Sequence, residues 1–191
     1  DCEPIQPDPT ITPIESVPTS VVPIQVAIQQ YTHPSHRFQL DYPEHWQYFE
    51  QPNSVQLVEP DGQAGYTVIF NQVDRKYNAD ELNQYLTAFV SQNFAQKETG
   101  FSAITQENRP DGTVSAQFSS IDANLGPTVT QIQVKQQGSI LFVTLVSATE
   151  EQWQLSAESL QRLANTLRPL DVMPADPTDE PPEWVLIGPT R

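Results

Sequence analysis

The sequence predicts one α+β domain, in which two helices pack on a mainly antiparallel sheet between two proline-rich segments. From about residue 31 to residue 169, short apolar runs and turn signals give the order four strands, helix, four strands, helix. Consecutive strands pair as hairpins, so this order favours antiparallel pairing over βαβ crossovers. A length of 191 residues suits one such domain with a spacer at 1–30 and a tail at 170–191.

The first four strands are predicted from apolar alternation and from one turn. Pro43 ends the first run, and Pro60-Asp61-Gly62 is a turn that joins the third strand to a β-branched and aromatic run at 66–73. The alternating and aromatic residues that define the first three strands are Phe38, Leu40, Tyr42, Trp46, Tyr48, Phe49, Val55 and Leu57.

The first helix is predicted after Asn78 or Asp80, either of which can cap it. Gly100 is the expected end of this helix. The apolar residues of its buried face recur at spacings of three and four: Leu82, Tyr85, Leu86, Phe89, Val90 and Phe94.

The second half of the domain reads as two hairpins and a closing helix. Strands are expected at 101–107 and 113–121 around the turn Pro110-Asp111-Gly112, and at 129–135 and 140–146 around a turn at 136–138. The strongly apolar 140–146 run is expected to be central. An amphipathic helix is expected at 150–167, with Trp153, Leu155, Leu160, Leu163 and Leu167 on its apolar face.

Glutamines mark a second, polar sheet face. Gln117, Gln131 and Gln133 fall at strand positions that face away from the apolar stripe. Such a neutral hydrogen-bonding face is either covered by a helix or meets a partner.

Proline dominates both ends of the chain. Residues 1–30 are expected to form an extended, semi-rigid spacer, and the acidic tail at 170–191 resists packing. Trp184 and Leu186 belong to a short apolar segment of this tail, which either folds back onto the domain or docks on a partner. Folding back is favoured because exposed apolar side chains are energetically unfavourable.

Charge and cysteine content limit the partners. The 24 acidic and 9 basic residues give a net charge of -15, which repels nucleic acid and anionic lipid. The charge either attracts a basic protein surface or a metal ion, or only keeps the chain soluble. Cys2 is the single cysteine, so no internal disulfide forms. The sequence contains no membrane-spanning segment and no signal peptide, and we expect a processed, extracytoplasmic monomer.

The motifs of common enzymes are missing from the sequence. A Gly-x-Ser-x-Gly elbow and a phosphate-binding glycine loop are both absent, and the histidines are confined to His33, His36 and His45. We therefore expect a protein that is not an enzyme, without catalytic residues or an organic cofactor. The three histidines, with Asp41 or Glu44, are a candidate Zn²⁺ or Cu²⁺ site; the alternative is that they are surface polar residues around the first strand.

The run Phe38-x-Leu40-x-Tyr42-Pro43-x-x-Trp46 resembles the opening of PsbP-type domains. That family includes the extrinsic lumenal subunits of photosystem II, the Mog-type nuclear import factors and many bacterial lipoproteins of unknown function. The resemblance covers about residues 31–170 and implies an α/β/α sandwich with a central antiparallel sheet. The acidic spacer of this chain differs from the partner-binding N-terminal segment of the photosystem subunits.

The lipoprotein branch of this family implies a lipid anchor and a role. Its members carry lipid on the first cysteine of the mature chain, which makes Cys2 the candidate anchor here. We expect a non-catalytic interaction or assembly-accessory module for a membrane or envelope complex, located in the periplasm, at the cell surface or in the thylakoid lumen. The alternative is a carrier of a small ligand or of Zn or Cu.

Overall fold

The computed structural model describes residues 27–96, 99–102 and 105–170 of the chain. Its helices are α1 (Ala79–Val90), followed by a π-helical turn at Ser91–Ala95, and α2 (Glu150–Ala164). Its strands are β1 (Ile28–Thr32), β2 (Phe38–Pro43), β3 (Gln47–Gln51), β4 (Ser54–Val58), β5 (Ala64–Gln72), β6 (Thr105–Asn108), β7 (Val114–Asp122), β8 (Gly126–Gln137), β9 (Ile140–Thr149) and β10 (Arg168–Pro169).

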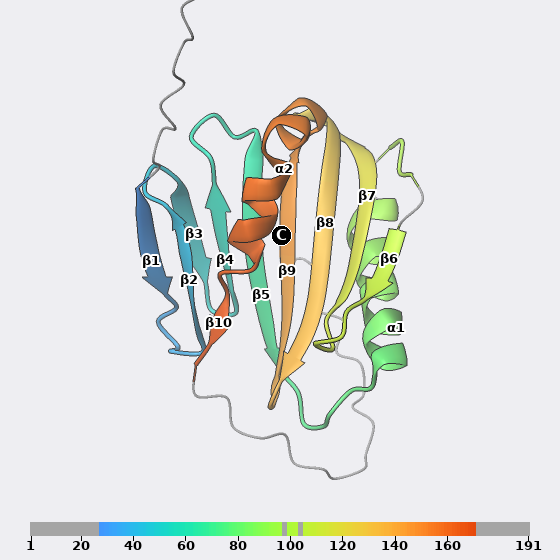
Figure 1. Ribbon diagram of the computed structural model, residues 1–191. Helices are drawn as coiled ribbons and strands as arrows, with labels where there is room; N and C mark the ends of the chain where they lie inside the picture. Colours follow the sequence, from blue (N-terminus) through green and yellow to red (C-terminus); the bar gives the residue numbers. More distant parts are fainter. Residues whose placement is uncertain (1–26, 97–98, 103–104, 171–191) are drawn as a thin grey trace, which may run out of the picture.

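The strands form two sheets in which neighbouring strands are antiparallel. Seven of them form the large sheet in the order β3-β4-β5-β9-β8-β7-β6, and the order of the small sheet is β1-β2-β10. Helix α2 lies across one face of the large sheet and α1 lies on the other (Figure 1). This arrangement confirms the predicted α+β sandwich with a mainly antiparallel sheet.

A hydrophobic core fills each face of the large sheet. On the α2 side, Phe38 of the small sheet packs with Tyr66 and Phe142 of β5 and β9 and with Leu160 of α2. On the other side, α1 packs on alternate residues of the same strands, which include Val143 of β9. The strict alternation of β9 between the two cores explains its almost continuous apolar sequence and its central position.

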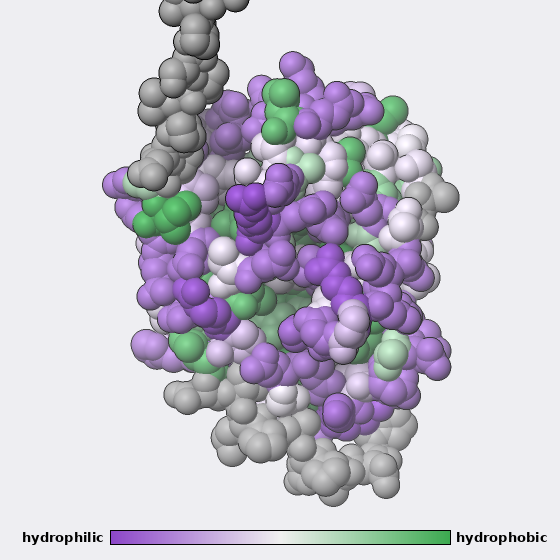
Figure 2. Space-filling model, viewed as in Figure 1, coloured by the Kyte–Doolittle hydropathy of each residue, from purple (hydrophilic) through white to green (hydrophobic). Residues whose placement is uncertain are grey.

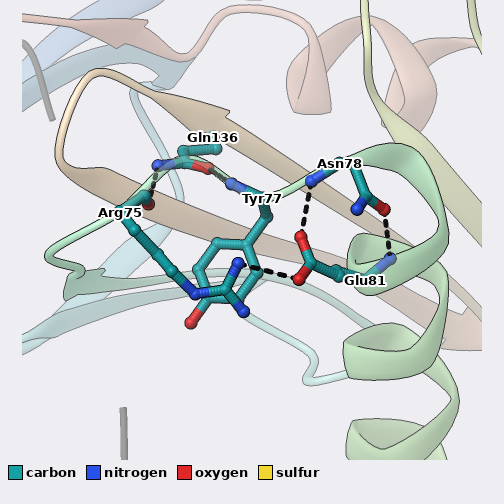
Figure 3. Close-up of polar contacts among 5 residues, drawn as sticks. All are labelled: Arg75, Tyr77, Asn78, Glu81 and Gln136. Atoms are coloured by element: carbon teal, nitrogen blue, oxygen red, sulfur yellow. Dashed lines mark hydrogen bonds and ion pairs between the residues drawn. The ribbon is translucent and has the colours of Figure 1, made fainter. Parts of the chain in front are cut away.

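The entry into α1 is fixed by a polar cluster (Figure 3). The Asn78 side chain accepts the backbone N–H of Glu81 at 3.0 Å, and the Glu81 carboxylate accepts the backbone N–H of Asn78 at 2.8 Å. The Gln136 side chain of β8 holds the preceding loop, because its Nε2 donates to the Arg75 carbonyl and its Oε1 accepts the Tyr77 N–H. The predicted cap at Asn78 is thus confirmed as a complete capping box.

The helix ends and two short strands differ from the prediction. The α-helical part of α1 ends at Val90, and Gly100 instead adopts a positive φ of 62° beside a bridge between Thr99 and Ile121. Helix α2 ends at Ala164, and its Leu155 is 78% exposed. The two unpredicted strands are β1, which begins at Ile28, and the two-residue β10.

Candidate functional site

The α2 face of the large sheet is only partly covered. Helix α2 lies over β5 and β9, while β6, β7 and the outer part of β8 carry no second layer among the described residues (Figure 1). Gln117 of β7 faces Gln131 of β8, and Ser115 faces Gln133. The structure places these side chains on the face away from α1, as predicted, because their neighbours along each strand belong to the α1 core. We call Ser115, Gln117, Gln131 and Gln133 the polar platform.

One atom of the polar platform is left without a partner. The Oε1 atom of Gln131 is shielded from solvent and accepts no hydrogen bond from any residue that the structure describes. A shielded amide oxygen without a donor is unfavourable.

A hollow of about 190 Å³ lies at the end of the polar platform beside the C-terminal end of α2. Figure 2 shows a depression on this face with an apolar floor and hydrophilic residues around it. Three elements converge there: the β6–β7 turn, the ends of β8 and β9, and the segment from α2 to β10. The lining residues are Arg109, Asp111, Thr113, Gln133, Lys135, Gln137, Phe142, Thr144, Ala164, Asn165, Leu167 and Pro169.

Two basic residues and one acidic residue line the hollow. Lys135 Nζ donates to Asp111 Oδ2 at 2.8 Å, and the Thr113 backbone N–H donates to Asp111 Oδ1 at 3.1 Å. These donors, Lys135 first, lower the pKa of Asp111 to about 2. In the part of the chain that the structure describes, no ion pair or side-chain hydrogen bond involves the Arg109 guanidinium. The hollow therefore has one excess positive charge in a strongly acidic protein.

We expect the Lys135→Gln substitution to raise the pKa of Asp111 from about 2 towards the ordinary value of 3.8, because it removes the principal donor. The Thr113 N–H still donates, so the pKa stays below 3.8. The stabilisation from Asp111 is present above pH 3.8 and is lost as the pH falls towards 2. Carbon-detected NMR titration of the Asp111 carboxyl measures this pKa. The exposed Lys76→Gln variant is the control; an unchanged pKa in Lys135→Gln contradicts the prediction.

The three candidate metal-binding histidines are not brought together. His33 and His36 lie in the turn before β2, and His45 lies after it. Six residues of extended strand span roughly 20 Å, so β2 separates His45 from the other two. In the described ranges, no three His, Cys, Asp or Glu side chains are placed to hold a metal ion. Zinc or copper binding at His33, His36 and His45 stays a prediction.

His33 is a structural residue of the β1–β2 turn. The residue is only 2% exposed, and its ring stacks on that of Phe38 with centroids 5.2 Å apart. The Ser35 backbone N–H donates to His33 Nδ1 at 3.2 Å, which leaves Nε2 to donate to the Gln51 carbonyl at 3.2 Å. Both ring nitrogens are therefore occupied within the turn.

The hydroxyl of Ser35 lies 2.7 Å from His33 Nδ1, which is the contact that a serine nucleophile needs. In a hydrolase the far nitrogen of that histidine meets an acid, whereas here it meets a backbone carbonyl. The two residues are separated by one position and belong to a tight turn. The pair thus matches local turn chemistry rather than a catalytic triad.

The remaining predicted site residues, Cys2, Trp184 and Leu186, lie outside the described residues. Their roles as lipid anchor and docking residues stay predictions. None of the helices in the described ranges has the length and apolar character that a membrane crossing requires.

Solved structures of very different proteins share this fold. Cyanobacterial PsbP (CyanoP) from Synechocystis sp. PCC 6803 matches with a TM-score of 0.55 and 13% identity, over 83% of this chain and 99% of that chain. The Ran-binding protein Mog1p of Saccharomyces cerevisiae matches with a TM-score of 0.52 and 9% identity, over 78% of this chain and 97% of that chain. A Bacteroides thetaiotaomicron protein matches with a TM-score of 0.52 and 17% identity, over 73% of this chain and 47% of that chain.

Sequence comparison adds no closer relationship, because no protein-family model and no curated protein matches the chain. The likeness to CyanoP and Mog1p covers almost their whole length. At identities below 20% these matches show the fold alone. The chain therefore has the fold of PsbP-like domains.

Proposed function

We propose that the domain is a non-catalytic interaction module, which binds a protein partner through the polar platform and so serves a membrane or envelope complex as an accessory factor. The observation that carries this proposal is the uncovered face of β6, β7 and β8 beside α2. A buried core on one side of these strands makes them rigid, and the exposed Gln117 with the half-buried Gln131 and Gln133 gives the other side a row of hydrogen-bonding amides.

One comparison supports a protein partner. One solved structure with this fold is that of a Ran-binding protein, so the fold is compatible with protein binding.

The proposed location rests on the sequence of the N-terminal segment. The proline-rich segment that precedes β1, which begins at Ile28, is the proposed spacer that holds the domain away from a membrane surface, and Cys2 is the proposed lipid anchor. The proposed location is therefore an extracytoplasmic face, in the periplasm, at the cell surface or in the thylakoid lumen. Mass spectrometry of the native chain's N-terminal peptide tests the anchor, since an unmodified Cys2 contradicts it.

Site-specific photo-crosslinking in native membranes tests the platform. The full chain carries p-benzoyl-phenylalanine in place of Gln117, on the platform, or in place of Gln84, which is exposed on α1 and serves as the matched control. We expect one reproducible protein adduct from position 117, at least about fivefold more abundant than any adduct from position 84. Equal labelling at the two positions, or none at 117, contradicts the proposal.

The hollow supports a second candidate function, that of a carrier for a small ligand. Its volume of about 190 Å³ is below the roughly 300–1,000 Å³ of pockets for drug-sized ligands, which favours the interaction module. A metal carrier is a separate possibility, because the histidines do not line the hollow, and calorimetric titration with Zn²⁺ and Cu²⁺ tests it. Binding that is lost when His33 and His36 are replaced together supports a metal carrier.

A further inference from the structure

We propose that the hollow beside α2 is an anchor site, which takes one apolar side chain of a protein partner together with a carboxylate next to it. This inference rests on the proposed interaction function and names the chemistry of the partner group. Three properties of the hollow carry it: its size, its apolar floor and the charge at its rim.

The size of the hollow suits a single side chain. Small-ligand pockets usually enclose about 300–1,000 Å³, and this hollow has about 190 Å³. Protein interfaces concentrate their binding energy in a few anchor residues that fill small, well-packed pockets. The hollow also lies next to the polar platform, because Gln133 belongs to both. A partner that covers the platform therefore reaches the hollow with a neighbouring residue.

Buried apolar residues contribute to the floor of the hollow, beside the buried Thr113 and Thr144. Phe142 belongs to the central strand β9 and is 2% exposed, and Ala164 at the end of α2 is 6% exposed. Leu167, beyond the helix, packs against the same core. An inserted aliphatic or aromatic side chain gains burial there without displacing a charged group.

The rim favours a carboxylate. Lys135 is engaged by Asp111, whereas the Arg109 guanidinium, which also lines the hollow, has no ion-pair partner among the described residues. Arginine binds carboxylates through two parallel hydrogen bonds, which gives it geometric selectivity for this group. The net charge of -15 opposes anions at long range, but at physiological salt charges beyond about 8 Å are screened, so the local excess of positive charge decides.

NMR titration of the full ¹⁵N-labelled chain with small probes tests the anchor. N-acetyl-L-phenylalanine presents the aromatic ring and carboxylate as a chain terminus, and the dipeptide amide acetyl-Phe-Glu-NH₂ presents them within a chain. We expect the more tightly bound of these two probes to shift the amide signals of Thr113, Gln133 and Lys135 with a dissociation constant of about 1 mM, the range of a weak fragment. N-acetyl-phenylalanine amide, which lacks the carboxylate, should bind at least about fivefold more weakly.

Two variants assign the effect to Arg109. Arg109→Gln should weaken binding of that probe at least about fivefold, whereas Arg162→Gln, which removes the same charge from an exposed position on α2 outside the hollow, should leave it unchanged. Equal binding of acid and amide probes, an unaffected Arg109→Gln variant, or shifts centred elsewhere overturn the anchor. Crosslinks at position 117 that persist in such a case leave the interaction function intact.

The apolar segment of the chain's own C-terminal tail, which contains Trp184, is the competing occupant of the hollow. In the full chain, Trp184→Ser should leave the amide signals of Thr113 and Lys135 in place. If that substitution shifts them in the absence of any probe, the tail rather than a partner fills the hollow, and the proposal is overturned.

Discussion

Replacing Phe38 by alanine is expected to lower the free energy of unfolding by about 3–5 kcal/mol. Phe38 is fully buried and joins the small sheet to the large one. Its ring lies 5.6 Å from that of Phe70 and 6.1 Å from that of Phe142, in edge-on arrangements. Truncation removes these contacts and leaves a cavity between two sheets, which relax only partly because each is fixed by its own hydrogen bonds.

Urea denaturation monitored by circular dichroism measures this loss. The midpoint should fall while the slope stays unchanged, since the fold and the exposed area on unfolding are kept. Leu155→Ala is the control, because Leu155 is an apolar residue of α2 that is 78% exposed, and its truncation should change stability by less than about 0.5 kcal/mol. A loss below about 1 kcal/mol for Phe38→Ala would show that the small sheet contributes little to the core.

Leu155 also shows where the sequence pattern was insufficient. The residues of α2 that reach the core are Leu160, Leu163 and Ala164, and Trp153 lies about two helical turns before Leu160 on the same face. Leu155 lies on a different face of the helix, so its apolar side chain is exposed although its residue type alone predicts burial. Most strands were predictable for the opposite reason, because their alternation matches the burial of every second residue, as in β2.

Short or polar elements could not be found from pattern. In β1 only Tyr31 is buried, and β10 has two residues, so both strands form through pairing with β2.

The end of the first helix differs for another reason. Its apolar spacing runs through Phe94 and so predicts a helix that continues to Gly100. In the structure a π-helical turn after Val90 changes the phase and still leaves Phe94 packed on Phe118.

The candidate site depends on tertiary register, which the sequence alone does not supply. Arg109 and Lys135 lie far apart in the chain, and Asp111 was assigned only to a turn. They meet because Val114 pairs with Val134 in the β7–β8 ladder, which brings the β6–β7 turn beside the end of β8. The sequence gives only an indirect indication of this site, because Arg109 and Lys135 are two of nine basic residues and both lie next to predicted turns. The histidines show the converse, because residues close in sequence are separated by the extended strand β2.

Leu86→Ala should destabilise the domain by about 2–5 kcal/mol, an effect of the same order on the other face of the sheet. Leu86 is fully buried between α1 and the large sheet. Gln84→Ala, at an exposed position of the same helix, is the control and should be nearly neutral, because alanine and glutamine are both good helix formers. Urea denaturation measures both variants.

This variant also tests whether the two cores unfold together. Trp46 and Trp153 both belong to the α2-side core, so in a Trp184→Phe background their fluorescence reports that side alone. Leu86 contacts the opposite side, yet β9 contributes alternate residues to both cores, and loss of one face leaves that strand half unsupported. We therefore expect fluorescence and circular dichroism to shift to the same lower midpoint. A fluorescence midpoint that stays at the wild-type value, with an early phase in circular dichroism, would show that α1 is a separate unit whose loss spares the face that carries the polar platform.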